Sequence, residues 1–491
     1  MKRPPADWQP AFAAFESGRL DVADQFCRQW LAGSEPPGEA FFLLGLIANN
    51  QGDHPASVAW LEQAAQRLEP SMRLWSALGG ACHAAGDWAR AEDYFTRCVG
   101  LDPQCREACL RLADLHHELR QPERAVPLYQ RAAELNPEEV YAWRKLADTL
   151  RELGAVEGSL AAYARALALC PEDPVLHANR GRLLLAAGRL AEGFREFEYR
   201  WQPLGLRRYS QPVWRGEPLP GKTLLVFAEQ GLGDTLQFVR FLPAARERVG
   251  RLVLECQPPL RSLLEQSHCG ADIVIAGEDR ETGDGSGAAT LGRRGVTPIA
   301  FDAYVPLLHL PSIFQVTLAT IPPVPRLQST AAVTLPETPP GQRRVGLVWA
   351  GNPALRDDAI RSIPLAQLEE LFRVPGVTWF NLQRHLPARD EAAFRASPLI
   401  QIMASVQDFA TTAAMINQLD LVISVDTAVA HLAGALGKPV WTLLPSSPDW
   451  RWLRDRTDTP WYPTMRLFRQ PRVGGWSPVV AAAVKDLINH R

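Results

Sequence analysis

The residue best suited to acid–base chemistry in the second half of the sequence is Asp234, which ends the stretch GLGD (231–234). This stretch follows the apolar run 224–227, so a buried strand would lead directly into a turn. A dinucleotide-binding loop needs a further glycine where a leucine stands here, which disfavours NAD binding. The glycines are interpreted as turn formers that bring Gln230 and Asp234 to the strand end. Such a turn would expose Asp234 for chemistry, and the alternative is that Asp234 only caps a helix over 235–241.

A second group of polar residues follows the apolar run Leu421–Val425. Asp426 and Thr427 come directly after this run and precede a predicted helix that contains His431. Thr427 suits an N-cap, and the free N–H groups at a helix start favour a pyrophosphate. Small residues fill the rest of the helix, which would let it lie close to a sheet. Because ligands of open α/β sheets bind at the carboxyl ends of strands, this stretch predicts a diphosphate site.

Two further strand ends carry polar candidates. Asn352 follows the apolar stretch 345–351, and Gln383 ends the stretch 377–383. Gln383 is a candidate for a base or for a ribose contact. Arg361 lies shortly after Asn352, and its guanidinium fork suits two phosphate oxygens, although a solvated surface charge is the alternative.

The apolar runs that would position these residues alternate with helix-like stretches, which predicts a parallel sheet with crossover helices. The strand candidates form two sets, 224–227, 251–256 and 271–277 in the first and 345–351, 377–383, 421–426 and 440–445 in the second. The proline-rich segment 329–344 between the sets is predicted to be a linker, and the glycine-rich segment 278–297 a mobile surface loop. Tryptophans and arginines gather in 445–470, where they would either stack on a nucleobase or sugar or pack a domain interface.

The first two hundred residues have a different period. Similar segments end at Pro70, Pro103, Pro137 and Pro171, which are spaced 33, 34 and 34 residues apart. Each segment predicts two amphipathic helices joined by a turn, with small residues such as Gly79 and Ala91 where the helices approach each other. This pattern resembles the tetratricopeptide repeat. Such units stack into a solenoid whose groove implies a bound protein or peptide, and the alternative is an array that dimerises or stiffens the protein.

A second resemblance covers residues 222–490. The stretch SVDTAVAHLAGALGKPV resembles the nucleotide-sugar motif of the heptosyltransferase-like family of glycosyltransferases, usually Asp-Thr-Gly-x-x-His before a helix of small residues. Asp426, Thr427 and His431 match this motif, whereas Ala428 replaces the glycine, so the identity of the donor is not carried over. The resemblance implies a GT-B fold of two Rossmann-like halves with the active site between them. It also implies that the last helix crosses back to the first half.

The resemblance implies roles for the candidate residues. In that family a Gly-Asp pair after the first strand supplies the base, which implies catalysis by Asp234. The implied reaction is an inverting, metal-independent transfer of a sugar from a nucleotide sugar to an acceptor hydroxyl, without a cofactor. The predicted donor-binding residues are Gln230, Gly233, Asn352, Arg361, Gln383, Asp426, Thr427 and His431.

The sequence leaves more than one candidate for the acceptor and for the class of function. Repeats joined to such a domain also resemble protein O-GlcNAc transferases, which implies a protein acceptor. The asparagine row of that enzyme's groove is not evident here beyond Asn179, so a lipopolysaccharide-like glycan is the other candidate acceptor. A different class of function is a non-catalytic repeat scaffold whose transferase-like half has lost turnover.

The length of 491 residues predicts several domains. We expect an α-solenoid of repeats over 1–204, the first Rossmann-like half over 205–328, a linker over 329–344 and the nucleotide-sugar-binding half over 345–491. The formal net charge of −2 gives no reason to expect nucleic acid as a partner.

Location and metal content are also predicted from composition. The first residues lack the apolar region of a secretory signal, and no apolar run approaches the roughly 20 residues of a membrane span. The eight scattered cysteines are typical of reduced thiols in a cytoplasmic protein. Cys105 and Cys109 lie near His116 and His117, but small buried thiols are the preferred interpretation there, so no metal site is predicted.

Overall fold

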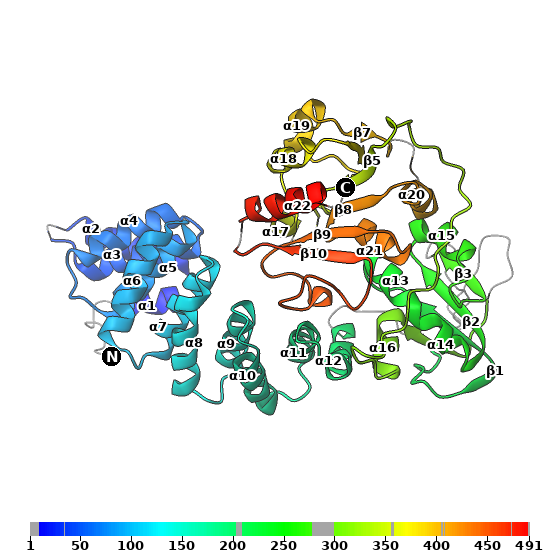
Figure 1. Ribbon diagram of the computed structural model, residues 1–491. Coiled ribbons are helices and arrows are strands. Elements are labelled where there is room, and N and C mark those ends of the chain that lie inside the picture. Colours follow the sequence, from blue (N-terminus) through cyan, green and yellow to red (C-terminus); the bar gives the residue numbers. More distant parts are fainter. Residues whose placement is uncertain are drawn as a thin grey trace. The chain divides into compact units, whose positions relative to one another are not determined.

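The computed structural model describes residues 9–33, 35–202, 209–276, 299–354, 358–403, 406, 408–472 and 474–489 (Figure 1). The chain divides into two compact units, Met1–Leu176 and His177–Arg491. The glycine-rich segment 278–297 lies outside the described residues. Within the part that the structure describes, no helix is both long and apolar enough to cross a membrane.

Helix pairs build the first unit, as the repeat period predicts. Its helices are α1 (Gln9–Glu16), α2 (Leu20–Leu31), α3 (Gly38–Asn50), α4 (His54–Ala65), α5 (Met72–Ala84), α6 (Trp88–Leu101), α7 (Arg106–Glu118), α8 (Pro122–Leu135), α9 (Val140–Glu152) and α10 (Val156–Leu169). The turn inside a pair needs a left-handed residue, and Gly52, Gly86 and Gly154 supply it with φ of 80°, 78° and 79°. Arg120 takes the same place in one pair with φ of 58°.

Small residues hold the two helices of a pair together. A Cβ on Gly79 in α5 would lie 2.6 Å from Cε1 of Phe95 in α6, so the ring fills the space that the glycine leaves. In a later pair the hydroxyl of Ser159 donates to the carbonyl of Ala147 over 2.7 Å. These contacts confirm the predicted tetratricopeptide pattern and explain why small residues recur at the same place in each unit.

Neighbouring glycines of α5 give a test of this packing. Gly79→Ala is expected to lower the free energy of unfolding by roughly 1–3 kcal/mol, because the methyl group overpacks against buried Phe95. Gly80→Ala is the matched control, since a Cβ there meets nothing within 4 Å. The control should stabilise the helix by roughly 0.5–1 kcal/mol through lost chain entropy. Urea unfolding followed by circular dichroism compares the two, and equal effects would contradict this account of the packing.

Two parallel sheets form the core of the second unit (Figure 1). The first sheet has the order β3-β2-β1-β4, with β1 (Leu219–Phe227), β2 (Val249–Cys256), β3 (Ile273–Ala276) and β4 (Ala303–Pro306). The second has the order β10-β9-β8-β5-β6-β7, with β5 (Arg343–Val348), β6 (Val377–Asn381), β7 (Ile400–Gln401), β8 (Leu421–Val425), β9 (Val440–Leu444) and β10 (Met465–Arg469). Counted along the chain, the second order is that of a Rossmann fold, whose ligand crevice lies where the order reverses, here between β5 and β8. The predicted fold class, a solenoid followed by an α/β region of the GT-B type, is confirmed.

The remaining helices precede, connect or follow these strands. They are α11 (Pro174–Ala186), α12 (Leu190–Phe197), η2 (Glu198–Trp201), α13 (Leu232–Phe238), η3 (Val239–Phe241), α14 (Leu242–Arg246), η4 (Pro258–Leu260), α15 (Arg261–Gln266), η5 (Leu307–His309), α16 (Leu310–Ile313), α17 (Asp358–Arg361), η6 (Leu365–Leu368), α18 (Glu369–Phe372), η7 (Ala388–Asp390), α19 (Glu391–Ala396), α20 (Phe409–Ile416), α21 (Ala428–Ala435), η8 (Trp450–Trp452) and α22 (Ser477–Asn489).

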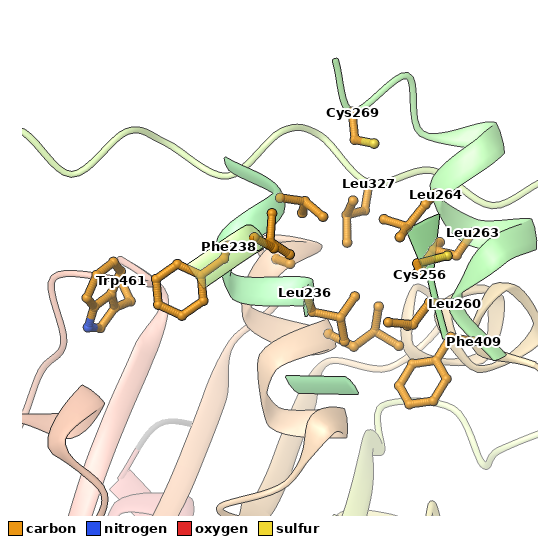
Figure 2. Packing of buried hydrophobic residues seen from close by; sticks show 14 of the residues in the cluster. Leu236, Phe238, Cys256, Leu260, Leu263, Leu264, Cys269, Leu327, Phe409 and Trp461 are labelled. Atoms are coloured by element: carbon orange, nitrogen blue, oxygen red, sulfur yellow. The ribbon is translucent and has the colours of Figure 1, made fainter. Parts of the chain in front are cut away.

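The two halves of this unit share one hydrophobic core. Phe238 of α13 packs against Trp461 edge-on with ring centroids 5.9 Å apart, and Figure 2 shows the two side chains beside each other. Leu236 and Phe409, from opposite halves, belong to the same buried cluster. The two halves are therefore packed together rather than separated by solvent along α13 and α21.

The observed boundaries differ from the predicted ones. The last repeat helix, α12, packs Phe194 edge-on against Trp450 at 5.6 Å, so this helix belongs to the second compact unit, which starts at His177. The end of the repeats at residue 204 stays a prediction. Helix α22 buries Val480 and Leu487 against the core of the second half, and so the implied crossing to the first half is wrong. The segment 329–344 contains the start of β5 and packs buried Leu335 into the shared core, so it is no free linker.

Candidate active site

Asp234 lies at the junction of the two halves. It is the third residue of α13, and its Oδ2 accepts the backbone N–H of Gly231 over 2.9 Å. Asp234 therefore lies in the first turn of a helix that starts earlier than predicted, at Leu232, and its side chain bonds to the N-cap residue Gly231. A catalytic role of Asp234 stays a prediction. The other carboxylate oxygen forms an ion pair with the guanidinium of Arg451, which comes from η8 of the second half. Both oxygens of Asp234 are thus engaged, and 14% of its side chain is exposed.

Arg451 joins Asp234 to a second carboxylate. Its Nη1 donates to Oδ1 of Asp449 over 2.6 Å, while its Nη2 pairs with Asp234. Burial lowers the pKa of Arg451 to about 10, so the guanidinium stays charged at neutral pH. A buried cation that bridges two carboxylates fixes both of them.

Asp426 and His431 lie together at the carboxyl end of β8, as the motif predicts. Nε1 of Trp452 donates to Oδ2 of Asp426 over 2.9 Å, and Nε2 of His431 lies 3.8 Å from Oδ1. The other ring nitrogen of His431 hydrogen-bonds the hydroxyl of Tyr462 at 3.0 Å. Burial lowers the pKa of His431 to about 4, against the opposing effect of Asp426. His431 is therefore neutral near pH 7 and suits the orientation of Asp426 better than direct charge pairing with a phosphate.

The depressed pKa of His431 predicts a pH-dependent stability. A group whose folded pKa is below its ordinary 6.5 stabilises the fold above pH 6.5 and loses that contribution as the pH falls through about 4. The difference corresponds to on the order of 3 kcal/mol. Between pH 6.5 and 4 the wild type should lose that much more unfolding free energy than His431→Gln, whose amide keeps the hydrogen bonds without titrating. Parallel pH dependences in denaturant titrations of the two proteins would refute this.

Gly233 permits the close approach of the two motifs. A Cβ at this position would lie 2.7 Å from Cδ2 of His431, so α13 contacts α21 only because residue 233 has no side chain. Gly233 therefore positions the helices, and a donor contact through its backbone stays a prediction. Gln230, in the same loop, accepts a hydrogen bond on its carbonyl from Nε2 of Gln257 over 2.6 Å.

Arg361 lies at the point where the strand order of the second sheet reverses. Its Nη1 donates to the backbone carbonyl of Asp426 over 3.2 Å, beyond β8. A Cβ on Gly351, which follows β5, would lie 2.5 Å from the other guanidinium nitrogen, Nη2. Arg361 thus spans the carboxyl ends of β5 and β8, with 23% of its side chain exposed and Asp358 as an ion-pair partner at 3.3 Å. This place suits a diphosphate, whereas the surface-charge alternative does not describe it.

The side chains of two further predicted site residues, Gln383 and Asn352, accept hydrogen bonds from nearby backbone N–H groups. Gln383 is buried, and its Oε1 accepts the N–H groups of Trp349 and Ala350 at 3.2 and 3.1 Å, so it fixes the loop after β5. A direct ribose or base contact by Gln383 would require these bonds to break. Asn352 is exposed, and its side chain accepts the N–H of Ala354 over 3.0 Å.

Thr427 is the N-cap residue of α21, but it makes no side-chain cap bond. Its hydroxyl instead lies 2.9 Å from Oγ of Ser424. The predicted cap position is therefore confirmed and the predicted cap bond is wrong. Among the described residues, no side chain caps the first N–H groups of α21, and free N–H groups at a helix start favour an anion.

The loop after β9 contributes residues to the site that were not predicted. Asp449, Arg451 and Trp452 contact the predicted residues, and the only signal was the gathering of arginines and tryptophans in 445–470. The tryptophans there are buried, with 5% exposure for Trp450 and 0% for Trp452, so the packing alternative is confirmed over nucleobase stacking. In the described ranges, no group of three or more His, Cys, Asp or Glu side chains is arranged to hold a metal ion.

Comparisons with known proteins agree with this division of the chain. Residues 72–115 and 110–174 match models of the tetratricopeptide repeat, and residues 389–468 match the model of glycosyltransferase family 9, described as heptosyltransferase. The chain thus carries tetratricopeptide repeats in its first part and a heptosyltransferase-family domain in its last part.

A curated relative and two solved structures are similar to this chain. Protein FlbA of Caulobacter vibrioides is 30% identical over 331 residues, which are 62% of this chain and 54% of FlbA, so the chain spans about half of that relative's length. A MamA structure (MSR-1) has 21% identity and a TM-score of 0.30 over 33% of this chain and 93% of its own. The structure of YrrB, titled a TPR protein with an unusual peptide-binding site, has 15% identity and a TM-score of 0.32 over 39% and 91%.

Proposed function

We propose that this chain transfers a sugar from a nucleotide-sugar donor to a hydroxyl group of a protein or glycan acceptor. The family 9 match supports glycosyl transfer in general. The observation that carries the finer proposal is the position of Arg361, which spans the ends of β5 and β8 beside the uncapped start of α21. A cation and a helix start at this crevice are what a diphosphate leaving group needs.

The proposed reaction is an inverting displacement without a metal ion. The acceptor oxygen forms a bond to the anomeric carbon while the bond from that carbon to the diphosphate oxygen breaks. The electron pair leaves with the nucleoside diphosphate, where Arg361 and the N–H groups of α21 stabilise the growing negative charge. The hydroxyl proton passes to a carboxylate at the junction, where Arg451 joins the predicted base Asp234 to Asp449.

The acceptor part of the proposal rests on the repeats. Stacked repeat units form extended surfaces that suit a protein or peptide chain, and this supports an acceptor or partner protein held by the first unit. Tetratricopeptide repeats could also bind a second copy of this chain. A glycan acceptor is the other candidate.

A non-catalytic scaffold is the second candidate function. Two observations favour it: Asp234 is held in an ion pair, and the two halves share a core. An ion-paired carboxylate is a poor base, because the neighbouring cation stabilises its charged form.

Turnover of a nucleotide-sugar panel decides between the two functions. The full chain is incubated with UDP-, GDP-, ADP- and CMP-linked sugars, and the free nucleotide released with water as acceptor is measured. Release from one donor supports the transferase. Failure of the folded protein to release or bind any nucleotide would support the scaffold.

A further inference from the structure

Asp449 differs from Asp234, the predicted base, in having a carboxylate oxygen without a hydrogen bond. Its Oδ1 accepts the backbone N–H and the Nη1 of Arg451 at 3.0 and 2.6 Å. Its Oδ2 accepts no hydrogen bond from any residue that the structure describes, and 36% of the side chain is exposed. Asp234, by contrast, uses one oxygen for Gly231 and the other for Arg451. A proton acceptor needs an oxygen that a substrate can reach. Oδ1 of Asp234 is buried and its side chain is 14% exposed, whereas the side chain of Asp449 is 36% exposed and its Oδ2 carries no hydrogen bond from the described residues.

The surroundings of Asp449 suit proton transfer near neutral pH. Desolvation by the surrounding protein and, second, the nearby carboxylate of Asp426 raise the pKa of Asp449 to about 7, above the ordinary value of 3.8. The cations that face it and oppose this rise are Arg451 of η8, Arg182 of α11 and Arg361 of α17. Since more than a third of the side chain is open to solvent, these charges act through water as well as protein. A carboxylate with a pKa close to the working pH is the most effective base.

The same surroundings place Asp449 beside the predicted donor site. Arg361 and Asp426, which are joined by a hydrogen bond of 3.2 Å, are both close enough to Asp449 to act on its charge. Asp449 belongs to the second half, as do these two residues. Asp449 is also linked to this region through Arg451 and Trp452 of η8, since Trp452 donates to Asp426 and Arg451 donates to Asp449.

We propose that Asp449, and not Asp234, accepts the proton of the attacking hydroxyl, and that Asp234 is a positioning residue that acts through Arg451. This inference rests on the proposed transferase function. The hydroxyl proton passes to Oδ2 of Asp449 as the acceptor oxygen bonds to the anomeric carbon and the nucleoside diphosphate leaves with the electron pair. The exposed carboxylic acid then returns the proton to solvent.

The positioning role of Asp234 follows from the ion pairs that Arg451 makes with both Asp234 and Asp449. Arg451 is buried, with 10% of its side chain exposed, and it shares its charge between the two carboxylates. Without the charge on Asp234, Arg451 would pair with Asp449 alone and lower the pKa of Asp449. Removing Asp234 should therefore move the pH at which activity appears, whereas removing Asp449 should remove activity at every pH.

Nucleotide release by Asp449→Asn and Asp234→Asn in the full chain tests this division of roles. Asp449→Asn is expected to lose roughly 10²–10⁴-fold in kcat at every pH while nucleoside diphosphate binding stays, and Asp449→Glu should restore part of the rate. Asp234→Asn should lose less than about tenfold in kcat. The fall of its kcat at acidic pH should begin at a lower pH than in the wild type. Calorimetric nucleotide binding and circular dichroism show that each variant is folded.

The wild-type pH profile is a second measurement that needs no variant. The wild-type kcat is expected to fall as the pH drops below about 7. A kcat that stays constant down to about pH 4 would overturn the role of Asp449. A fully active Asp449→Asn, or a loss confined to Asp234→Asn, would also overturn it. If the wild type releases no nucleotide from any donor, the proposed function itself fails, whereas wild-type turnover with an unaffected Asp449→Asn refutes only this inference.

Discussion

Arg361→Gln is expected to reduce kcat for nucleotide release by roughly 10²–10³-fold, because the transition state loses the cation that faces the leaving diphosphate. Arg361 lies between the ends of β5 and β8 and is held there by the carbonyl of Asp426. A diphosphate leaves with more negative charge than it carries in the donor, so the loss should be larger in kcat than in donor affinity. Steady-state kinetics with the donor found in the panel measures both.

Arg373→Gln is the matched control for this prediction. Arg373 belongs to the same half, 69% of its side chain is exposed, and it only pairs with Glu369 along a helix. The control should keep its rate, because an exposed pair of this kind contributes little. Equal losses in the two variants, or an Arg361→Gln protein with wild-type kcat, would show that Arg361 does not act on the leaving group.

Gly233→Ala is expected to lower the free energy of unfolding by roughly 1–3 kcal/mol and to reduce turnover, because the added methyl group drives α13 away from α21. The Cβ would lie 2.7 Å from Cδ2 of His431. The imidazole cannot retreat, since it stacks on Trp452 at 5.2 Å and meets the ring of Tyr462 at 5.7 Å. The displacement would also move the start of α13, and with it the link from Asp234 to the second half.

A double-mutant cycle isolates this contact. In a His431→Ala background the methyl group has room, so Gly233→Ala should cost much less than in the wild type, with a coupling of roughly 1 kcal/mol or more. Urea unfolding followed by tryptophan fluorescence measures the four proteins. Additive effects would mean that α13 and α21 are not held together at this point.

Local signals explain what could be predicted from the sequence. The repeat helices follow from a 34-residue spacing, and the turns follow from glycines such as Gly86, whose φ is 78°. Strands β1 and β8 follow from the apolar runs that precede Asp234 and Asp426, and the fold brings the two motifs to one junction. The short strands β4, β7 and β10 were not predicted, because brief apolar runs have no local signal that distinguishes a strand from a loop.

The ionic contacts of the site depend on pairings between distant parts of the chain. Arg451 reaches Asp234 only because η8 packs on α13, and no periodicity in either segment encodes this contact. Gln383 was predicted to touch the donor, whereas its amide fixes backbone N–H groups after β5. Residue type and strand-end position therefore indicated where the site lies, but the role of each side chain depended on its partners.

The most direct test of the central claim is calorimetric titration of the full chain with nucleoside diphosphates, comparing wild type, Arg361→Gln and Arg373→Gln. The account predicts saturable binding of one nucleoside diphosphate by the wild type and by Arg373→Gln, and binding that is weakened at least roughly tenfold in Arg361→Gln. A folded wild-type protein that binds none of them, or Arg361→Gln that binds as tightly as the wild type, would contradict a donor site between β5 and β8.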